Sequence, residues 1–297
     1  MRQPFVIALM LVLPASLVLA DFTDTVTQAD SLHDQGKFAD AKALLLDTVA
    51  QTQDGKEQAE LYWRVSREII ELGDLAEKAK KSQDEVLAFF VDGEQYADKA
   101  ISADPSNDLG YFWKSANIGR WGQVKGVFNA LGKAPDIRDL LLKVLSLNPD
   151  RSDAYFVLGQ LYRELPGWPI SFGNSDWAVS LGRKAVDLNV AEVAAGKEKD
   201  SSFDFRTELA KSLHVRNWTA ANRRQEQHWK TSKYASVKDA FEKACYYEGS
   251  QTLKDVSDAQ EAKEMVQEVV AALQALPDPT AGQIKNLREA KDILKSW

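Results

Sequence analysis

Three related heptapeptides recur along the chain and constrain its fold more than any other feature. They are Lys99–Pro105, Lys143–Pro149 and Lys184–Val190, and their first residues lie 44 and 41 positions apart. The first two end in Asp-Pro or Asn-Pro, which stops a helix because proline lacks an N–H and restricts the residue before it. A helix end repeated at this spacing predicts a tandem array of helical hairpins.

Two kinds of position recur in the first helix of each predicted unit. A small residue is followed three positions later by a large one, so that the second helix of the hairpin can approach closely. This pattern predicts an all-α, tetratricopeptide-like superhelix of helical hairpins with elongated repeats; ordinary helical periodicity in a bundle is the alternative. The small positions are Ala29, Ser66, Ser115 and Gly159, and the large ones are Leu32, Ile69, Ile118 and Tyr162.

The repeat exceeds the usual period of about 34 residues, and we expect the extra residues between the two helices of each unit. The segment Leu75–Asp92 keeps a helical pattern, whereas Val124–Asp136 is interrupted by glycine and proline. The segment Leu165–Ser175 contains two prolines and two glycines, which predicts a loop. Asn174 or Ser175 should cap the helix that follows.

The pattern weakens after Val190, but the chain still predicts helices. We expect a hairpin from Phe203–Val215 and Trp218–Lys230, then a helix over Ala235–Tyr246, and two closing helices over 259–276 and 280–297. A solenoid needs such amphipathic caps at its ends. We therefore predict one domain over residues 21–297, with weaker repeats from about residue 197.

The first twenty residues have the pattern of a secretory signal peptide. Arg2 precedes an apolar stretch that is too short to span a bilayer, and small residues lie at −3 and −1 relative to Ala20. We expect cleavage after Ala20 and a periplasmic location, with no membrane span in the mature chain; an N-terminal membrane anchor is the alternative.

Composition and missing motifs argue against catalysis and against nucleic-acid binding. The formal net charge of −7 disfavours a general nucleic-acid binder, and one cysteine with three histidines disfavours a Cys- or His-based metal centre. Nucleophile-elbow, zinc-protease and phosphate-loop motifs are missing. We predict no enzyme activity, no cofactor and no metal. Asp136 and Asp139 are interpreted as a solvated face rather than a cation site, and Cys245 as a buried thiol.

Several motifs resemble those of one bacterial family. They are the run Tyr111–Trp121, the segment Asp136–Asp139, the run Leu158–Arg163 and the segment Pro166–Asn174 with its Pro-Gly-Trp-Pro sequence. Over Asp84–Leu188 the chain resembles the T-component proteins associated with TRAP transporters and, more distantly, the tetratricopeptide part of the regulators of microtubule dynamics. The resemblance implies a non-catalytic, extracytoplasmic helical protein that binds a periplasmic solute-binding protein, and it raises homo-oligomerisation. The family's lipid-attachment cysteine is missing from this chain.

Tryptophan and arginine supply the candidate binding residues, because these two side chains often anchor interfaces. Asn117, Arg120 and Trp121 fall on one stripe of a predicted helix, where Asn117 and Arg120 can bind a carboxylate or a peptide backbone. Their alternative role is to brace the Pro166–Asn174 loop. We expect Trp168 to plug the groove, with partner contact as the alternative. The full predicted partner- or ligand-binding set is Trp113, Asn117, Arg120, Trp121, Arg163 and Trp168.

The sequence leaves three functional hypotheses open. The first is a periplasmic adaptor that binds a protein partner through the groove lined by the first helices of the repeats. The second is a carrier that encloses a small apolar ligand, which requires a hydrophobic tunnel. The third is a scaffold of the cell envelope.

Overall fold

The structure is a computed structural model that describes residues 22–198 and 203–297. Within these ranges the chain forms thirteen α-helices and one short 3-10 helix, with no β-strand. None of these helices combines the length and the apolar character needed to cross a membrane. The predicted signal peptide, residues 1–20, lies outside the described residues.

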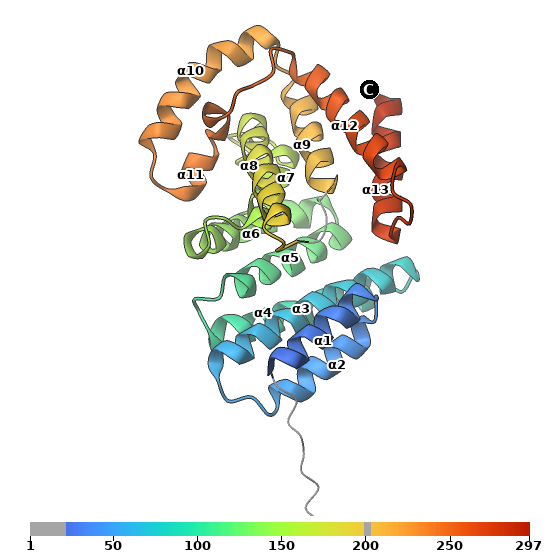
Figure 1. Cartoon of the computed structure of the whole chain (residues 1–297). Helices are drawn as coiled ribbons and strands as arrows, with labels where there is room; N and C mark the ends of the chain where they lie inside the picture. Colours follow the sequence, from blue (N-terminus) through green and yellow to red (C-terminus); the bar gives the residue numbers. More distant parts are fainter. Residues whose placement is uncertain (1–21, 199–202) are drawn as a thin grey trace, which may run out of the picture.

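The first eight helices form four consecutive antiparallel hairpins, which stack in chain order (Figure 1). This arrangement confirms the all-α, tetratricopeptide-like architecture. The hairpin helices are α1 (Phe22–Asp34), α2 (Phe38–Val49), α3 (Gly55–Lys78), α4 (Gln83–Ala103), α5 (Asp108–Lys125), α6 (Val127–Leu147), α7 (Ser152–Glu164) and α8 (Ser175–Ala194).

Polar side chains at the helix starts explain where many of these elements begin. Asp54 accepts hydrogen bonds from the backbone of Lys56 and Glu57, and Ser82 forms a reciprocal capping box with Glu85. Asn174 accepts from the backbone of the first turn of α8, which confirms one of the two predicted caps. Such caps satisfy backbone N–H groups that have no partner inside the helix.

The recurring small positions lie where helices approach most closely. Ala29, Ser66, Ser115 and Gly159 are all buried. A Cβ atom added to Gly159 would lie 3.3 Å from the backbone oxygen of Ala178, so α7 and α8 touch almost backbone to backbone there. The large positions Ile69, Ile118 and Tyr162 are buried, whereas Leu32 in the terminal hairpin is only half-buried.

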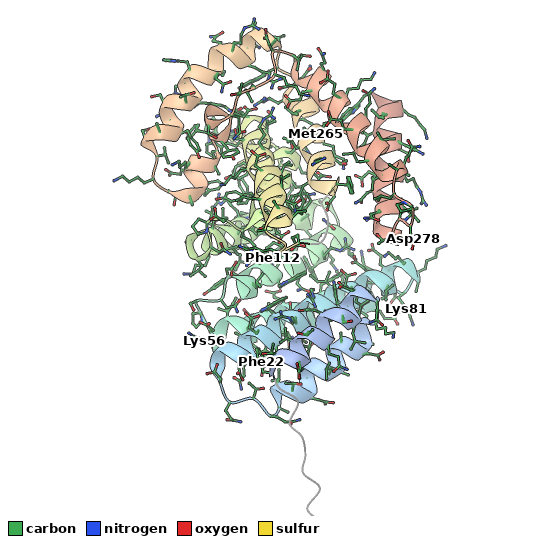
Figure 2. The ribbon with its side chains drawn as sticks, in the orientation of Figure 1. Phe22, Lys56, Lys81, Phe112, Met265 and Asp278 are labelled. Atoms are coloured by element: carbon green, nitrogen blue, oxygen red, sulfur yellow. The ribbon has the colours of Figure 1, made fainter. Side chains whose placement is uncertain are left out.

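The apolar core continues from one hairpin to the next. Phe112 lies on α5 between the N-terminal hairpins and the C-terminal helices (Figure 2). Its neighbour Trp113 packs against the cluster around Phe90 and also against the cluster around Tyr155 and Leu158. One residue of α5 therefore joins the N-terminal and central parts of the core.

The extra residues of the repeats are accommodated in two ways. In the second and third hairpins they lengthen the helices: α3 and α4 together absorb Leu75–Asp92, and α6 continues through Pro135 after a break at Gly126. The prediction of an interrupted segment over Val124–Asp136 is therefore wrong, except at Gly126. In the fourth hairpin the segment between α7 and α8 is a loop, as predicted.

The C-terminal third departs most from the prediction. It contains α9 (Phe203–Arg216), α10 (Ala220–Ser236), α11 (Ala240–Ala244), η1 (Tyr247–Ser250), α12 (Asp258–Gln274) and α13 (Ala281–Ser296). The predicted hairpin of α9 with α10 does not form, because α9 packs between α8 and α12 while α10 packs on η1. The predicted helix over Ala235–Tyr246 shrinks to α11, since the chain turns between Val237 and Asp239. The two closing helices, α12 and α13, are confirmed.

Candidate partner-binding site

Asn117 is fully buried and is not available to a partner, contrary to the prediction for this residue. Its side-chain nitrogen donates to Ser66 Oγ at 2.9 Å and to the backbone oxygen of Trp113 at 2.9 Å, while Ser66 Oγ donates to the backbone oxygen of Gly93 at 2.8 Å. This node joins α3, α4 and α5. The position of Asn117 in the sequence does not indicate that its side chain is buried.

Arg120 faces α3 and not the loop between α7 and α8. Its guanidinium donates to Asp74 at 2.6 Å and to Glu77 at 2.8 Å, and it also contacts Gln123. The alternative role of Asn117 and Arg120, bracing the Pro166–Asn174 loop, is therefore wrong as well. Arg120 is about one quarter exposed, so it ties two hairpins together at the surface.

The two tryptophans of α5 pack against other helices. The ring of Trp113 stacks on the ring of Trp63, with the two centroids 6.4 Å apart. The guanidinium of Arg64 lies over the Trp63 ring, 4.0 Å from its centroid. Trp113 Nε1 is buried and has no hydrogen-bond partner among the described residues. Trp121 is half-buried and packs against the cluster of Ile70, Val86 and Phe90. The predicted stripe of α5 thus serves mainly to join α3, α4 and α5.

Arg163 connects α7 to α9 through Glu208. Its side chain is only 8% exposed and lies 2.5 Å from the Glu208 carboxylate, and it also pairs with Glu164 at 2.7 Å. Burial alone would raise the pKa of Glu208, but Arg163 and Lys211 outweigh burial and lower the pKa. The charge of Arg163 is thus neutralised inside the protein.

Trp168 points into solvent and does not plug a groove. It is 90% exposed, and Ile170 in the same loop is 79% exposed, which makes them the two most exposed large apolar side chains in the described part of the chain. The prediction of a plug is therefore wrong. Proline on either side indicates a stiff loop but does not indicate the direction in which its tip points.

The base of this loop is held firmly. Gly173 N donates to the backbone oxygen of Pro166 at 3.0 Å, and Asn174 N donates to that of Tyr162 at 2.8 Å. A Cβ atom on Gly173 would collide with the backbone oxygen of Leu165. Phe172 packs edge-on against Tyr162, and the Arg138 guanidinium lies 4.7 Å from the centre of the Phe172 ring. The loop therefore presents Trp168 and Ile170 from a fixed platform.

A largely buried cluster of eight charged side chains, which we call the ion cluster, lies in α8 and the C-terminal third and was not predicted. It brings four cationic side chains from α8, α9 and α10 together with four carboxylates from α8, η1 and α12. Its members are Asp176, Arg183, Arg216, Arg223, Lys230, Glu248, Asp258 and Glu261. Directly paired members lie up to 78 residues apart in sequence, so no local spacing indicates them.

Electrostatic pairing in the ion cluster outweighs the cost of burial. Arg216 Nη1 lies 2.6 Å from Glu248, and Arg216 Nε lies 2.7 Å from Asp258. Burial alone would raise the pKa of Glu248, but Arg216, Lys230 and Arg183 hold that pKa well below its usual range. The cluster is charge-balanced, and it joins α10 and η1 to the rest of the molecule.

Two hollows in the described part of the chain bear on the carrier hypothesis. One, of about 440 Å³, is an open depression along α13 lined by Lys285, Arg288, Glu289, Asp292, Ile293 and Ser296. The other, between α7, α8 and α9, has about 10 Å³, which is at the lower limit for a single water molecule. Neither hollow is an enclosed cavity large enough for an apolar ligand.

The surroundings of Asp136, Asp139 and Cys245 show how these residues are used in the fold. Asp136 and Asp139 are exposed and pair with Lys133 and Arg138, and within residues 22–198 and 203–297 no group of three or more His, Cys, Asp or Glu side chains is arranged to hold a metal ion. Cys245 is buried, as predicted, and burial raises the pKa of its thiol.

These features define a helical-repeat protein whose predicted binding residues are mostly internal, with one exposed aromatic loop. Residues 25–167, just under half of the chain, match the family model described as Regulator of microtubule dynamics protein 1-3. Regulator of microtubule dynamics protein 1 from Mus musculus is 24% identical over 158 residues, which are 53% of this chain and 47% of the relative. The protein from Bos taurus is 25% identical over 49% of this chain and 43% of the relative. The chain thus spans about half the length of the curated relatives it matches.

The chain also resembles solved structures at low sequence identity. A thermophilic TPR protein from Thermus thermophilus has a TM-score of 0.47 and 14% identity, over 76% of this chain and 96% of that chain. The MamA protein has a TM-score of 0.43 and 13% identity, over 87% of this chain and 98% of that chain. The family model and the curated relatives support the resemblance to the regulators of microtubule dynamics; the resemblance to the TRAP-associated T-components stays a prediction.

Proposed function

We propose that this protein is a non-catalytic helical-repeat scaffold that binds a protein partner through the loop between α7 and α8. The observation that carries the proposal is the loop tip, where Trp168 is 90% and Ile170 is 79% exposed on a tightly hydrogen-bonded base. Tryptophan at a rigid, exposed position is typical of interface anchors, because it buries a large area at little cost in conformational entropy.

The charges around the tip favour a protein partner. The Glu164 carboxylate at the end of α7 is 69% exposed, and the Asp139 carboxylate beside the loop base is 65% exposed. Each carboxylate is paired with a neighbouring arginine, Glu164 with Arg163 and Asp139 with Arg138, so the base of the loop carries charges of both signs, as the polar rim of a protein interface does.

A finer form of the proposal concerns place and partner. The signal-peptide pattern of residues 1–20 and the resemblance to T-components support a periplasmic protein whose partner is an extracytoplasmic solute-binding protein. The names of the matched relatives refer to microtubule dynamics, and the chain spans only half of those relatives. N-terminal sequencing of the secreted protein tests the location: the first residue should be Asp21, and an intact Met1 would contradict cleavage.

The test of the partner site compares the unaltered chain with a tip variant, Trp168→Ala with Ile170→Ala. Both are used to capture proteins from a periplasmic extract, and a retained protein is then purified and titrated against each. We expect the tip variant to lose at least about tenfold in affinity, which is about 1.4 kcal/mol, because both side chains would be buried on binding. The melting temperature should stay unchanged, since both residues are solvent-exposed.

Trp229→Ala is the matched control, because Trp229 is also an exposed tryptophan but lies on α10. It should bind the partner as the unaltered chain does. Equal loss of affinity in the control and the tip variant would contradict the assigned site. A chain that retains no protein at all would contradict the scaffold function itself.

A further inference from the structure

The helix α10 is attached to the molecule by polar groups. None of the described apolar clusters contains a residue of α10. Its inward stripe consists of Arg223, Gln227 and Lys230, at the spacing i, i+4, i+7 that amphipathic helices normally fill with apolar residues. Figure 1 shows α10 and α11 forming an arc at the edge of the molecule.

The stripe enters a slot formed by α8, α9, η1 and α12. Lys230 Nζ lies 2.5 Å from Asp176, 2.9 Å from Glu248 and 2.9 Å from Ser180 Oγ. Arg223 donates to Glu261 at 2.6 Å and to the backbone oxygen of Val256 at 2.7 Å. Each basic side chain of the stripe thus reaches acceptors from more than one element.

The charges of slot and helix are complementary. Without α10, the slot holds four carboxylates, Asp176, Glu248, Asp258 and Glu261, against two guanidinium groups, Arg183 and Arg216. Its formal charge is then −2 (four negative and two positive), and Arg223 and Lys230 supply +2. Buried charges without partners are costly, so the empty slot would favour a basic occupant.

The backbone of α10 also fits the slot closely. A Cβ atom on Gly249 would collide with the backbone of Lys230, and the Gln227 side chain donates to the backbone oxygens of Glu248 at 2.8 Å and Gln251 at 2.9 Å. The apolar contacts of α10 include two ring pairs, Trp229 with Tyr246 and Tyr234 with Tyr247, and Trp229 is itself exposed. Removal of α10 would therefore uncover polar groups and leave the apolar core covered.

Both ends of α10 are joined to anchored segments. Before the helix begins, the backbone N–H of Trp218 donates to Asp258 Oδ2, and that of Asp258 donates to the backbone oxygen of Trp218, both at 2.9 Å. After it ends, Ala244 and Cys245 of the next segment are buried in the central core. The helix can thus leave the slot while its flanking segments stay in place.

We propose that this slot is a binding site for a basic helix and that α10 is its internal ligand. A helix supplied by another molecule, with Arg and Lys seven residues apart and Gln between them, binds the same slot once α10 is withdrawn. This inference is independent of the loop tip at Trp168, which lies between α7 and α8.

The test first displaces α10 from the slot by charge-reversal substitutions and then measures binding of the same helix added as a separate peptide. In the full chain with Arg223→Glu and Lys230→Glu, hydrogen exchange of residues 220–236 should accelerate by at least about tenfold, while α8, α9 and α12 keep their protection. A synthetic peptide of residues 218–237 should then bind this variant saturably. The same peptide with Arg223→Ala and Lys230→Ala should bind at least about tenfold more weakly.

Arg224→Glu with Lys233→Glu is the matched control, because it makes the same charge change on the exposed face of α10. It should leave the exchange of α10 unchanged. Unchanged protection of α10 in the slot variant, joint loss of protection in α8, α9 and α12, or failure of the peptide to bind would each overturn the inference. In the unaltered chain, α10 should exchange faster than α8; equal exchange would also overturn it.

Discussion

At the scale of single residues, close packing leaves some positions no room for a methyl group. Gly93 lies on α4, and a Cβ atom there would collide with the buried Asn117 side chain. We expect Gly93→Ala to lower the free energy of unfolding by roughly 2 kcal/mol, because overpacking forces side chains from their preferred rotamers. Urea denaturation measures this change.

Gly132→Ala is the control for this substitution. Gly132 lies in α6, and a Cβ atom there would have open space around it. We expect this change to be neutral or to stabilise the chain by up to about 1 kcal/mol, as alanine is the better helix former. If both variants lost the same stability, the Asn117 contact would not explain the effect of Gly93→Ala.

Because the carboxyl group of Asp153 is buried, its ionisation should make the stability of the protein depend on pH. Burial raises the pKa of Asp153 to about 6, and Glu192, Glu198 and Asp204 add to this, while Arg151 opposes it. Since the folded-state pKa lies above the unfolded value of 3.8, the charged side chain destabilises the fold above pH 6. This cost disappears as the pH falls from about 6 to about 4.

Asp153→Asn should therefore stabilise the protein at pH 7.5, by up to about 3 kcal/mol, and have little effect at pH 4. The neutral amide removes the cost of burying the charge and keeps the shape of the side chain. Urea denaturation of both chains at the two pH values tests this. Asp150→Asn, at a highly exposed position, should show no such difference; a stabilisation independent of pH would contradict the assignment.

At the scale of elements, the loop between α7 and α8 depends on one glycine. A side chain at Gly173 would collide with the backbone oxygen of Leu165 and open the hydrogen-bonded base below Trp168. We expect Gly173→Ala to destabilise the protein by about 1–3 kcal/mol and to weaken partner binding. Thermal unfolding and the binding assay with the retained partner measure both effects.

Gly167→Ala is the control within the same loop. A Cβ atom at Gly167 would lie 3.4 Å from the backbone oxygen of Gly173, an ordinary contact distance. This variant should melt and bind like the unaltered chain. If Gly173→Ala were tolerated equally well, the base of the loop would be able to rearrange, contrary to what its hydrogen bonds indicate.

The helices themselves were largely predictable from sequence because their signals are local. Buried small residues such as Ser66 and Gly159, and the capping residue Asn174, follow from spacing and side-chain chemistry within a few residues. The partner of α9 was not predictable in this way. Its packing against α12 depends on the apolar faces of two helices separated by α10, α11 and η1.

The candidate site was less predictable than the fold, and the reason is physical. Composition singles out Trp and Arg as interface residues, but the same side chains fill cores and neutralise buried carboxylates, as Trp113 and Arg163 do. The exposure of Trp168 depends on the path of a loop, and sequence spacing does not determine that path. Arg216 on α9 likewise meets Glu248 on η1 and Asp258 on α12 only through tertiary packing of these three elements.

At the scale of the whole molecule, the stacked arrangement predicts that stability differs along the chain. Each hairpin contacts mainly its neighbours, so a defect at one end should not unfold the other directly. The N-terminal core around Leu45 and Ile69 shares no residue with the C-terminal core around Leu213 and Val266. The ion cluster belongs entirely to the C-terminal third and to α8.

Arg216→Ala should therefore unfold the C-terminal part first. It would leave Glu248 and Asp258 buried with fewer cationic partners, which costs about 3–5 kcal/mol for a buried pair. We expect hydrogen exchange to accelerate in α9, α10 and α12 while α1–α4 keep their protection, and thermal unfolding to split into two steps. Arg224→Ala, at a side chain that is 61% exposed, should change neither measurement. A single step with uniform loss of protection would instead show that the N-terminal and C-terminal parts unfold as one cooperative unit.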